Sequence, residues 1–424
     1  MRGVLAVVLA AACVFGLPAE AAAAAAPPDG ACRGDPEPAR DVITQLPWAQ
    51  QLLDLGRTWP HSTGAGVTVA VVDSGVDADH PQLRGKVLPG ADFFLVGDLP
   101  GDFDCVSHGT AAASIIAASP AVGVGFRGVA PDARVLPVRV TDRELNDSGE
   151  ATPINPGIVA EGIRYAADSG ATVINLSLSG YGDFPDIRDA VAYAQSKDAL
   201  LVAAVGNRAD QGAVPSFPAS YDGVLGVGSI NIEGVRARDS QIGSYVDLVA
   251  PGQDVVAASR VAGHHYWAGT SFAAPFVSGV AALVRSAHPE LDAKQVVARL
   301  LATADPAPGG RNSLEYGAGI VDPYRAVTEE LSDRAPLSVP GVSPKPPDPA
   351  RLREAAWWSD MSAGAKFGAG LVVAAVAVAV VLAVALPRAR RRRWAATRRA
   401  PLPDTPDRTE TPDQVFLFPA GRTP

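Results

Sequence analysis

A continuous apolar segment near the start of the chain restricts the possible folds most strongly. Residues 66–75 read Gly66-Val67-Thr68-Val69-Ala70-Val71-Val72-Asp73-Ser74-Gly75, a β-branched run that ends in an acid and a glycine turn. A strand that is apolar on both faces is typical of a parallel sheet covered by helices on both sides. This segment therefore predicts an α/β protein with a buried central strand.

Strands and helices alternate along the chain that surrounds this segment. Further strands are expected over residues 134–140, 171–178, 199–205, 224–230 and 246–249. Helices are expected over residues 41–59, 108–118, 156–169, 186–197, 270–287 and 292–302. This alternation predicts three layers, with a mainly parallel sheet between two layers of helices.

Two segments are typical of export and membrane insertion. Residues 1–26 open with Arg2, continue through an apolar stretch and end in small residues, as a secretory signal peptide does. Residues 367–386 carry no charge, are long enough to cross a bilayer as one helix, and are followed by an arginine cluster that begins at Arg388. The positive-inside rule then places residues 387–424 in the cytoplasm. We therefore expect a single-pass protein of the cell membrane whose globular part is extracytoplasmic.

The remaining chain divides by composition. Residues 27–40 form a polar, proline-containing arm, residues 41–331 one globular domain, and residues 332–366 a proline-rich linker. Residues 142–155 are polar and acidic, which predicts a long surface loop. The net charge of −9 gives no reason to expect a nucleic acid partner.

Three polar residues occupy positions where parallel-sheet enzymes place functional groups, at or after the carboxyl ends of strands. Asp73 ends the central strand, His108 begins the next helix, and Ser271 lies in the first turn of an apolar helix. Taken alone, Ser271 could be a helix cap or a nucleophile whose own N–H stabilises an oxyanion. The chain order Asp73, His108, Ser271 is that of the subtilisin triad, and it favours the nucleophile.

The segments around these residues resemble the motifs of the subtilase family. The matching segments are Asp73-Ser74-Gly75, His108-Gly109-Thr110, Val173–Gly180, Ala203–Asn207 and Gly269-Thr270-Ser271-Phe272-Ala273-Ala274-Pro275. The resemblance implies a subtilisin-like fold and a serine endopeptidase acting on peptides or proteins, without cofactor. No acidic calcium loop is evident, so we expect no metal ion.

The resemblance also assigns roles to individual residues. Asp73 would orient His108, His108 would act as the base, and Ser271 would attack the peptide bond. Asn207 would complete the oxyanion hole. The strand that binds the substrate would consist of Ser177, Leu178, Ser179 and Gly180. Two residues depart from the family pattern: Phe272 follows the serine where methionine is common, and Ser179 replaces a frequent glycine.

The order of segments resembles that of the mycosins, the membrane-anchored subtilases of actinobacterial type VII secretion systems. The shared features are the N-terminal arm, Pro47-Trp48-Ala49-Gln50, the segment Asp104–His108, the long loop, the proline-rich linker and the C-terminal anchor. The pair Val106-Ser107 departs from the acid and glycine typical of mycosins. The resemblance implies that the protein processes secreted substrates and stabilises a type VII secretion membrane complex. The alternatives are a mainly structural component of that complex and a general surface protease.

The chain contains Cys13, Cys32 and Cys105. Cys13 lies within the expected signal peptide, so an exported protein retains an even pair. Such a pair predicts one disulfide, Cys32–Cys105, between the arm and the loop before His108. The alternative is two free thiols.

Overall fold

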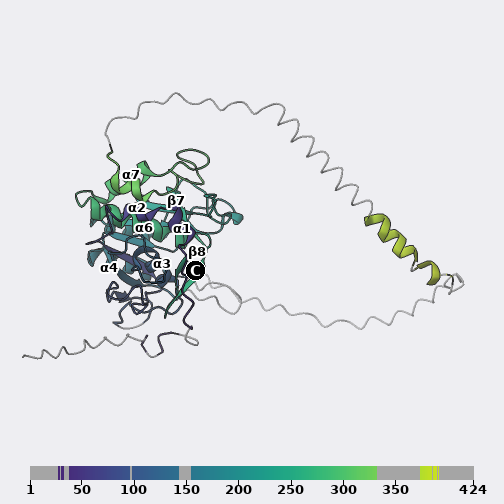
Figure 1. The fold of residues 1–424 in the computed structure, drawn as a ribbon, viewed down its shortest axis with the longest axis horizontal. Helices are drawn as coiled ribbons and strands as arrows, with labels where there is room; N and C mark the ends of the chain where they lie inside the picture. Colours follow the sequence, from purple (N-terminus) through teal and green to yellow (C-terminus); the bar gives the residue numbers. More distant parts are fainter. Residues whose placement is uncertain are drawn as a thin grey trace, which may run out of the picture. The chain divides into compact units, whose positions relative to one another are not determined.

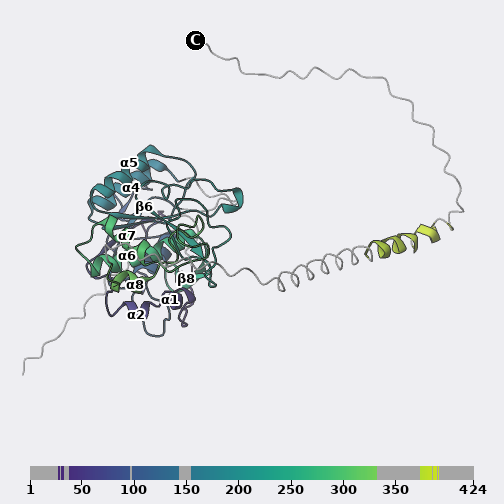
Figure 2. The same cartoon turned by 90° about the horizontal axis from the view of Figure 1, so that it is seen from above.

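The computed structural model describes residues 27–28, 30–32, 38–95, 98–142, 154–331, 373–383, 385–388 and 390. The chain divides into two compact units, Met1–Asp333 and Arg334–Pro424. The first unit contains the sheet and the helices drawn in Figures 1 and 2.

In the second unit, residues 373–383 and 385–388 are helical. Within the described residues, no helix combines the length and the apolar character that a membrane crossing requires. The expected membrane segment, residues 367–386, is described only in part. The expected signal peptide (residues 1–26), the linker (332–366) and most of the long loop (142–155) and of the C-terminal tail (387–424) lie outside the described residues.

The central sheet of the first unit has seven strands in the order β2-β3-β1-β4-β5-β6-β7, and every neighbouring pair is parallel. The strands are β1 Thr68–Asp73, β2 Ala91–Asp92, β3 Arg134–Arg139, β4 Val173–Leu176, β5 Leu200–Ala204, β6 Val224–Ile230 and β7 Leu248–Pro251. In register, Val71 of β1 lies between Pro137 of β3 and Asn175 of β4. The β-branched segment is therefore an inner strand, as the sequence predicts.

Helices cover both faces of this sheet. Val69 and Val71 point toward the α3 and α6 side, whereas Ala70 and Val72 point toward the α4 and α5 side. Figure 2 shows α4 and α5 on one side of β6, with α6, α7 and α8 on the other. The helices are α1 Trp48–Leu52, α2 Leu55–Thr58, α3 His108–Ala117, α4 Pro156–Asp168, α5 Pro185–Ser196, α6 Thr270–Ala287, α7 Ala293–Thr303 and α8 Pro323–Thr328. The three predicted layers are present.

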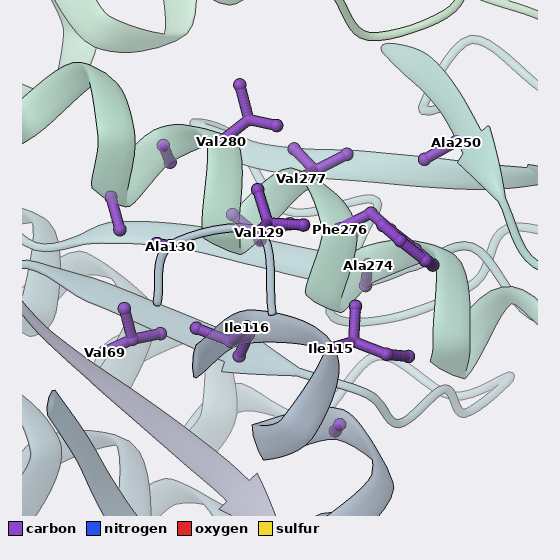
Figure 3. Close-up of a cluster of buried hydrophobic side chains, with 14 of the residues drawn as sticks. Val69, Ile115, Ile116, Val129, Ala130, Ala250, Ala274, Phe276, Val277 and Val280 are labelled. Atoms are coloured by element: carbon purple, nitrogen blue, oxygen red, sulfur yellow. The ribbon is translucent and has the colours of Figure 1, made fainter. Parts of the chain in front are cut away.

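Packing between α3 and α6 holds the two helices side by side. Figure 3 shows Ile115 of α3 below Ala274 and Phe276 of α6, and Ile116 of α3 below Val129, all within one buried apolar cluster. Burial of such side chains contributes about 1.5–3 kcal/mol each to folding. The contact fixes α3, which starts at His108, beside α6, which starts at Thr270.

The N-terminal part of the domain differs from the expected helix over residues 41–59. It forms two short helices, α1 and α2, separated at Asp54, whose φ of 45° is left-handed. The preceding residues are extended because their backbone pairs with a distant hairpin. Arg40 N–H donates to Ala262 O (2.9 Å), and His264 N–H donates to Asp41 O (3.0 Å). That antiparallel hairpin, β8 Val255–Ala258 and β9 His264–Trp267, was not predicted, and its strands of four residues each are too short to give a clear pattern.

Candidate active site

The candidate residues gather at the carboxyl edge of three adjacent strands. Asp73 ends β1, Ser177 follows β4, and Asn207 follows β5. These strands are neighbours in the order β1-β4-β5. Functional groups of an open parallel sheet lie at this edge, because the loops that leave it converge there.

Asp73 and His108 form a direct pair. The Nδ1 atom of His108 lies 2.7 Å from Oδ1 of Asp73, whose side chain is 3% exposed. The same oxygen accepts a hydrogen bond from Ser74 N–H at 2.7 Å. A carboxylate at Nδ1 holds the proton on that nitrogen, which leaves Nε2 of the neutral ring as an acceptor for a nucleophile's proton.

A second buried carboxylate, Asp104, organises the loop before His108. Its Oδ1 accepts from Ser74 Oγ (3.0 Å), Val106 N–H (2.9 Å) and Ser107 N–H (3.1 Å). Its Oδ2 accepts from Thr110 N–H (2.9 Å) and Thr110 Oγ1 (2.7 Å). Burial raises the pKa of Asp104 to about 6, against the opposing effect of the hydrogen bonds.

The contacts of Asp104 support an unusual backbone at the start of α3. Ser107 immediately before His108 has a left-handed φ of 66°, which is uncommon for a residue with a side chain. In the sequence, Asp104 stands out only through the resemblance of residues 104–108 to the mycosins. Its position four residues before the histidine was the one available signal of a role.

Ser271 lies in the first turn of α6 and is 5% exposed. The ring of the next residue, Phe272, lies 5.0 Å from the ring of His108, and the ring of Trp267 lies 5.1 Å from that of Phe272. In the described part of the chain, no hydrogen bond joins the Ser271 hydroxyl to His108. The structure therefore brings Asp73 and His108 together directly, and it places Ser271 beside them through Phe272. Hydrogen bonds between catalytic groups are often long before substrate binds.

The side-chain amide of Asn207 has a fixed orientation. Its Oδ1 accepts from Thr270 N–H (2.8 Å) and from Thr270 Oγ1 (2.9 Å). The Nδ2 atom faces the turn before Ser271, because a methyl group on Gly269 would lie 3.0 Å from it. The φ of 132° at this position is also one that residues with a side chain rarely adopt, which favours glycine. Since Oδ1 is occupied, Nδ2 is the group available to donate near Ser271.

The four residues of the expected substrate strand are not equivalent. Gly180 N–H donates to Phe217 O (2.7 Å), and Phe217 N–H donates to Gly180 O (2.8 Å). Ser177 Oγ donates to the carbonyl of Ser271 (2.6 Å), which ties the end of β4 to α6. Both backbone polar groups of Gly180 are therefore engaged within the protein. Leu178 is buried and Ser179 is half-buried.

A disulfide joins the arm to the loop before His108. Cys32 and Cys105 have an S–S distance of 2.01 Å and are 73 residues apart in sequence. Behind Cys105, the fully buried Arg139 pairs with Asp92 (2.7 Å) and with Asp142. Across the described ranges, no cluster of acidic, histidine or cysteine side chains could hold a metal ion.

Residues 64–319 match the sequence profile of the subtilase family. The chain belongs to the subtilase family. It is a serine peptidase of the subtilisin type, as the three motifs predict. Mycosin-4 of Mycobacterium tuberculosis is 38% identical to this subtilase over 348 residues, which cover 72% of this chain and 75% of mycosin-4. Thermitase of Thermoactinomyces vulgaris is 36% identical over 280 residues, which cover 66% of this chain and 95% of thermitase.

Solved structures give the same relationship. MycP1 with its N-terminal propeptide removed matches this subtilase with a TM-score of 0.59 and 33% identity, over 68% of this chain and all (100%) of that one. A chain of an intact ESX-5 inner membrane complex matches with a TM-score of 0.60 and 32% identity, over 80% of this chain and 92% of that one. The protein is thus related to mycosins as well as to other bacterial serine proteases such as thermitase.

Proposed function

We propose that this subtilase hydrolyses peptide bonds through Asp73, His108, Ser271 and Asn207. His108 Nε2 takes the proton of the Ser271 hydroxyl while its oxygen attacks the scissile carbonyl carbon. Asp73 accepts the Nδ1–H of His108 and stabilises the imidazolium that forms. The resulting oxyanion accepts hydrogen bonds from Asn207 Nδ2 and from Ser271 N–H at the start of α6.

The tetrahedral intermediate collapses when His108 gives its proton to the leaving amine, and the acyl group stays on Ser271. A water molecule then attacks the acyl-enzyme with His108 again as base, which releases the acid product and restores the serine. The observation that carries this proposal is the 2.7 Å pair of Asp73 and His108 beside the first turn of α6.

The proposal is tested by hydrolysis of an unfolded protein such as reduced casein. We expect Ser271→Ala to lose activity by about 10⁶-fold, as nucleophile removal does in comparable triads. Ser286→Ala is a matched control, because Ser286 lies on the same helix and, in the described part of the chain, its hydroxyl donates only to Ala65 O (2.8 Å). Activity that survives Ser271→Ala, or that is lost equally in Ser286→Ala, would contradict the assignment.

We further propose that the peptidase domain, residues 41–331, is held outside the cell membrane by a helix over residues 367–386, after removal of residues 1–26. The support is the uncharged segment with its arginine cluster. Fractionation tests this: the full chain should pellet with membranes, and a chain ending at residue 366 should be released in soluble form. An added protease should then degrade the peptidase domain in intact spheroplasts but spare the C-terminal tail.

We also propose that this enzyme works with a type VII secretion membrane complex. The support is the similarity to mycosin-4 and to a chain of the ESX-5 inner membrane complex. A second candidate role is structural, because that similar chain is part of an assembled complex. Comparing secreted proteins by mass spectrometry separates the two: Ser271→Ala should leave secretion intact but substrates unprocessed, whereas deletion should abolish secretion if the structural role exists.

A further inference from the structure

Three hydroxyl groups converge beside the proposed oxyanion hole. A methyl group on Gly206, the residue before Asn207, would lie 3.0 Å from Tyr181 Oη and 3.2 Å from the Oγ atoms of both Ser179 and Ser216. The three hydroxyls come from the segment after β4 and from the segment before the Phe217 bridge. They therefore form one polar cluster against the backbone of Gly206, which we call the hydroxyl pocket.

The position of the hydroxyl pocket determines which part of a substrate would meet it. If Asn207 Nδ2 holds the oxygen of the scissile carbonyl, the residue that supplies this carbonyl (P1) has its α carbon one bond from the reacting carbon. Because Gly206 directly precedes Asn207, we expect the P1 side chain to lie beside the hydroxyl pocket.

The deepest of the three hydroxyls lacks a partner. Ser216 has an exposed fraction of 0%, and its Oγ forms no hydrogen bond with any residue in the described ranges. An unpaired buried hydroxyl costs free energy that an incoming acceptor removes. A polar P1 side chain gains this contact, whereas a large apolar one would cover the hydroxyls without pairing them.

The positively charged side chain of Arg208 lies at the edge of the hydroxyl pocket. Arg208 directly follows Asn207, is exposed, and places its guanidinium 5.2 Å from the centroid of the Tyr181 ring. Among the residues that the structure describes, Arg208 has no ion pair. The nearby Asp183 is already paired with Arg188. The uncompensated charge favours an anionic P1 side chain and disfavours a basic one.

We infer that the hydroxyl pocket and Arg208 select substrates with aspartate or glutamate at P1. The hydroxyls of Ser179, Tyr181 and Ser216 donate to the carboxylate, and Arg208 supplies the opposite charge. The inference rests on the proposed role of Asn207, because that residue fixes where P1 lies.

The test uses the full-length protein in detergent and internally quenched peptides with mixed residues at all positions except P1. P1 is fixed as Glu, Gln, Asp, Asn, Ala, Leu or Lys, and mass spectrometry identifies the bond cleaved. We expect kcat/KM for Glu or Asp to exceed that for Ala and Leu by about tenfold or more, since hydrogen bonds to charged groups are the stronger ones. Cleavage after Lys should be the slowest.

Two variants separate the charge from the hydroxyls. Arg208→Gln should reduce the ratio of kcat/KM for P1 Glu over P1 Gln by about tenfold, and Ser216→Ala should slow cleavage after both residues. Arg134→Gln is the matched control, because Arg134 is also exposed and begins β3 at the amino edge of the parallel sheet, opposite the edge that carries Asn207. An unchanged Glu-to-Gln ratio in Arg208→Gln, or a preference of the unmodified enzyme for Ala, Leu or Lys, overturns the inference.

Labelling with a fluorophosphonate distinguishes the two levels of failure. If Ser271 reacts with the probe but peptides with acidic P1 residues are not the preferred substrates, the inference is wrong and the proposed function stands. If Ser271 does not react and no peptide is cleaved, the proposed function itself is wrong, and the inference falls with it.

Discussion

Thr270 donates both its backbone N–H and its hydroxyl to Oδ1 of Asn207, at 2.8 and 2.9 Å. The Thr270 hydroxyl also accepts from Gly206 N–H at 3.1 Å. Thr270, the residue before the nucleophile Ser271, thus orients the side-chain amide of Asn207. These two hydrogen bonds to Oδ1 explain why Asn207 presents Nδ2, and not Oδ1, toward the turn that carries Ser271.

The first prediction concerns that amide. Asn207→Leu keeps the approximate size of the side chain but removes the donor, so kcat should fall by about 10²–10³, or 2.7–4 kcal/mol, with KM little changed. Thr270→Val should cost less, about 1 kcal/mol or several-fold in kcat, because Thr270 N–H still donates to Oδ1, although Oδ1 and Gly206 N–H each lose one hydrogen bond to the hydroxyl. Thr270→Ser keeps the hydroxyl and serves as control. Steady-state kinetics on one peptide decides; an unchanged kcat in Asn207→Leu contradicts the oxyanion role.

The second prediction concerns Asp104. Its folded-state pKa is raised to about 6 from 3.8, so the protonated form favours the folded state. The associated stability is present below about pH 4 and is lost as the pH rises through about 6, a change on the order of 3 kcal/mol. Asp104→Asn removes this titration, so urea unfolding should show the variant at its greatest relative disadvantage at pH 4. A stability difference that is constant from pH 4 to 7 would refute this.

Thr110 provides a check on the same carboxyl group. Thr110→Val removes the hydroxyl that donates to Asp104 Oδ2 at 2.7 Å and therefore removes an effect that lowers the pKa of Asp104. The pH at which stability declines should move upward in this variant. No movement, or movement toward lower pH, would mean that another group titrates in this range.

The third prediction concerns a buried pair of histidines, His264 of β9 and His80, whose ring centroids lie 6.3 Å apart. His264 is 6% exposed and His80 is 1% exposed; burial lowers the pKa of both, that of His264 to about 4. His264 Nδ1 accepts from Ile43 N–H (3.1 Å), and its Nε2 bonds to Gln82 Oε1 (2.7 Å). Because the unfolded histidine titrates near 6.5, stability present at neutral pH should be lost as the pH falls from 6.5 to 4.

Thermal unfolding across that pH range tests the histidine prediction. His264→Gln should flatten the dependence, although it lowers stability at pH 7 because two hydrogen bonds change. His265→Gln is the matched control, since His265 is the next residue of β9 and is exposed. Equal slopes in His264→Gln and in the unmodified protein would exclude His264 as the source.

The fourth prediction concerns the arm. Replacing both Cys32 and Cys105 by serine opens a loop of 73 residues, and loop entropy gives an upper bound of about 4 kcal/mol of lost stability. The kcat should stay within about twofold, because Asp104 anchors the loop before His108 by its own hydrogen bonds. Urea unfolding and peptide hydrolysis measure the two effects. A large fall in kcat without loss of stability would place the disulfide in the catalytic machinery instead.

Local sequence patterns predicted the elements that carry the site. The apolar run of β1 ends at Asp73 as expected, and α3 and α6 begin where His108 and the Gly269 turn indicate. Each of these signals lies within a few residues of the element it predicts. Buried strands and apolar helices are therefore readable from periodicity and turn chemistry.

Contacts between distant segments could not be read in this way. The extended arm at Arg40 depends on the hairpin at Ala262, and the orientation of Asn207 depends on Thr270. The pairing of Gly180 with Phe217 likewise engages a residue that was expected to be free for substrate. Backbone and amide groups pair with whatever the tertiary fold brings near them, and no local pattern records that partner.

The rate of Ser271 modification by a fluorophosphonate, measured by intact mass and peptide mapping, tests the central claim most directly. In the unmodified enzyme one adduct should form, on Ser271, and Asp73→Asn should slow its formation by about 10⁴-fold because His108 is then held in the wrong tautomer. An adduct on another residue, or an equal rate in Asp73→Asn, would contradict activation of Ser271 by the Asp73–His108 pair.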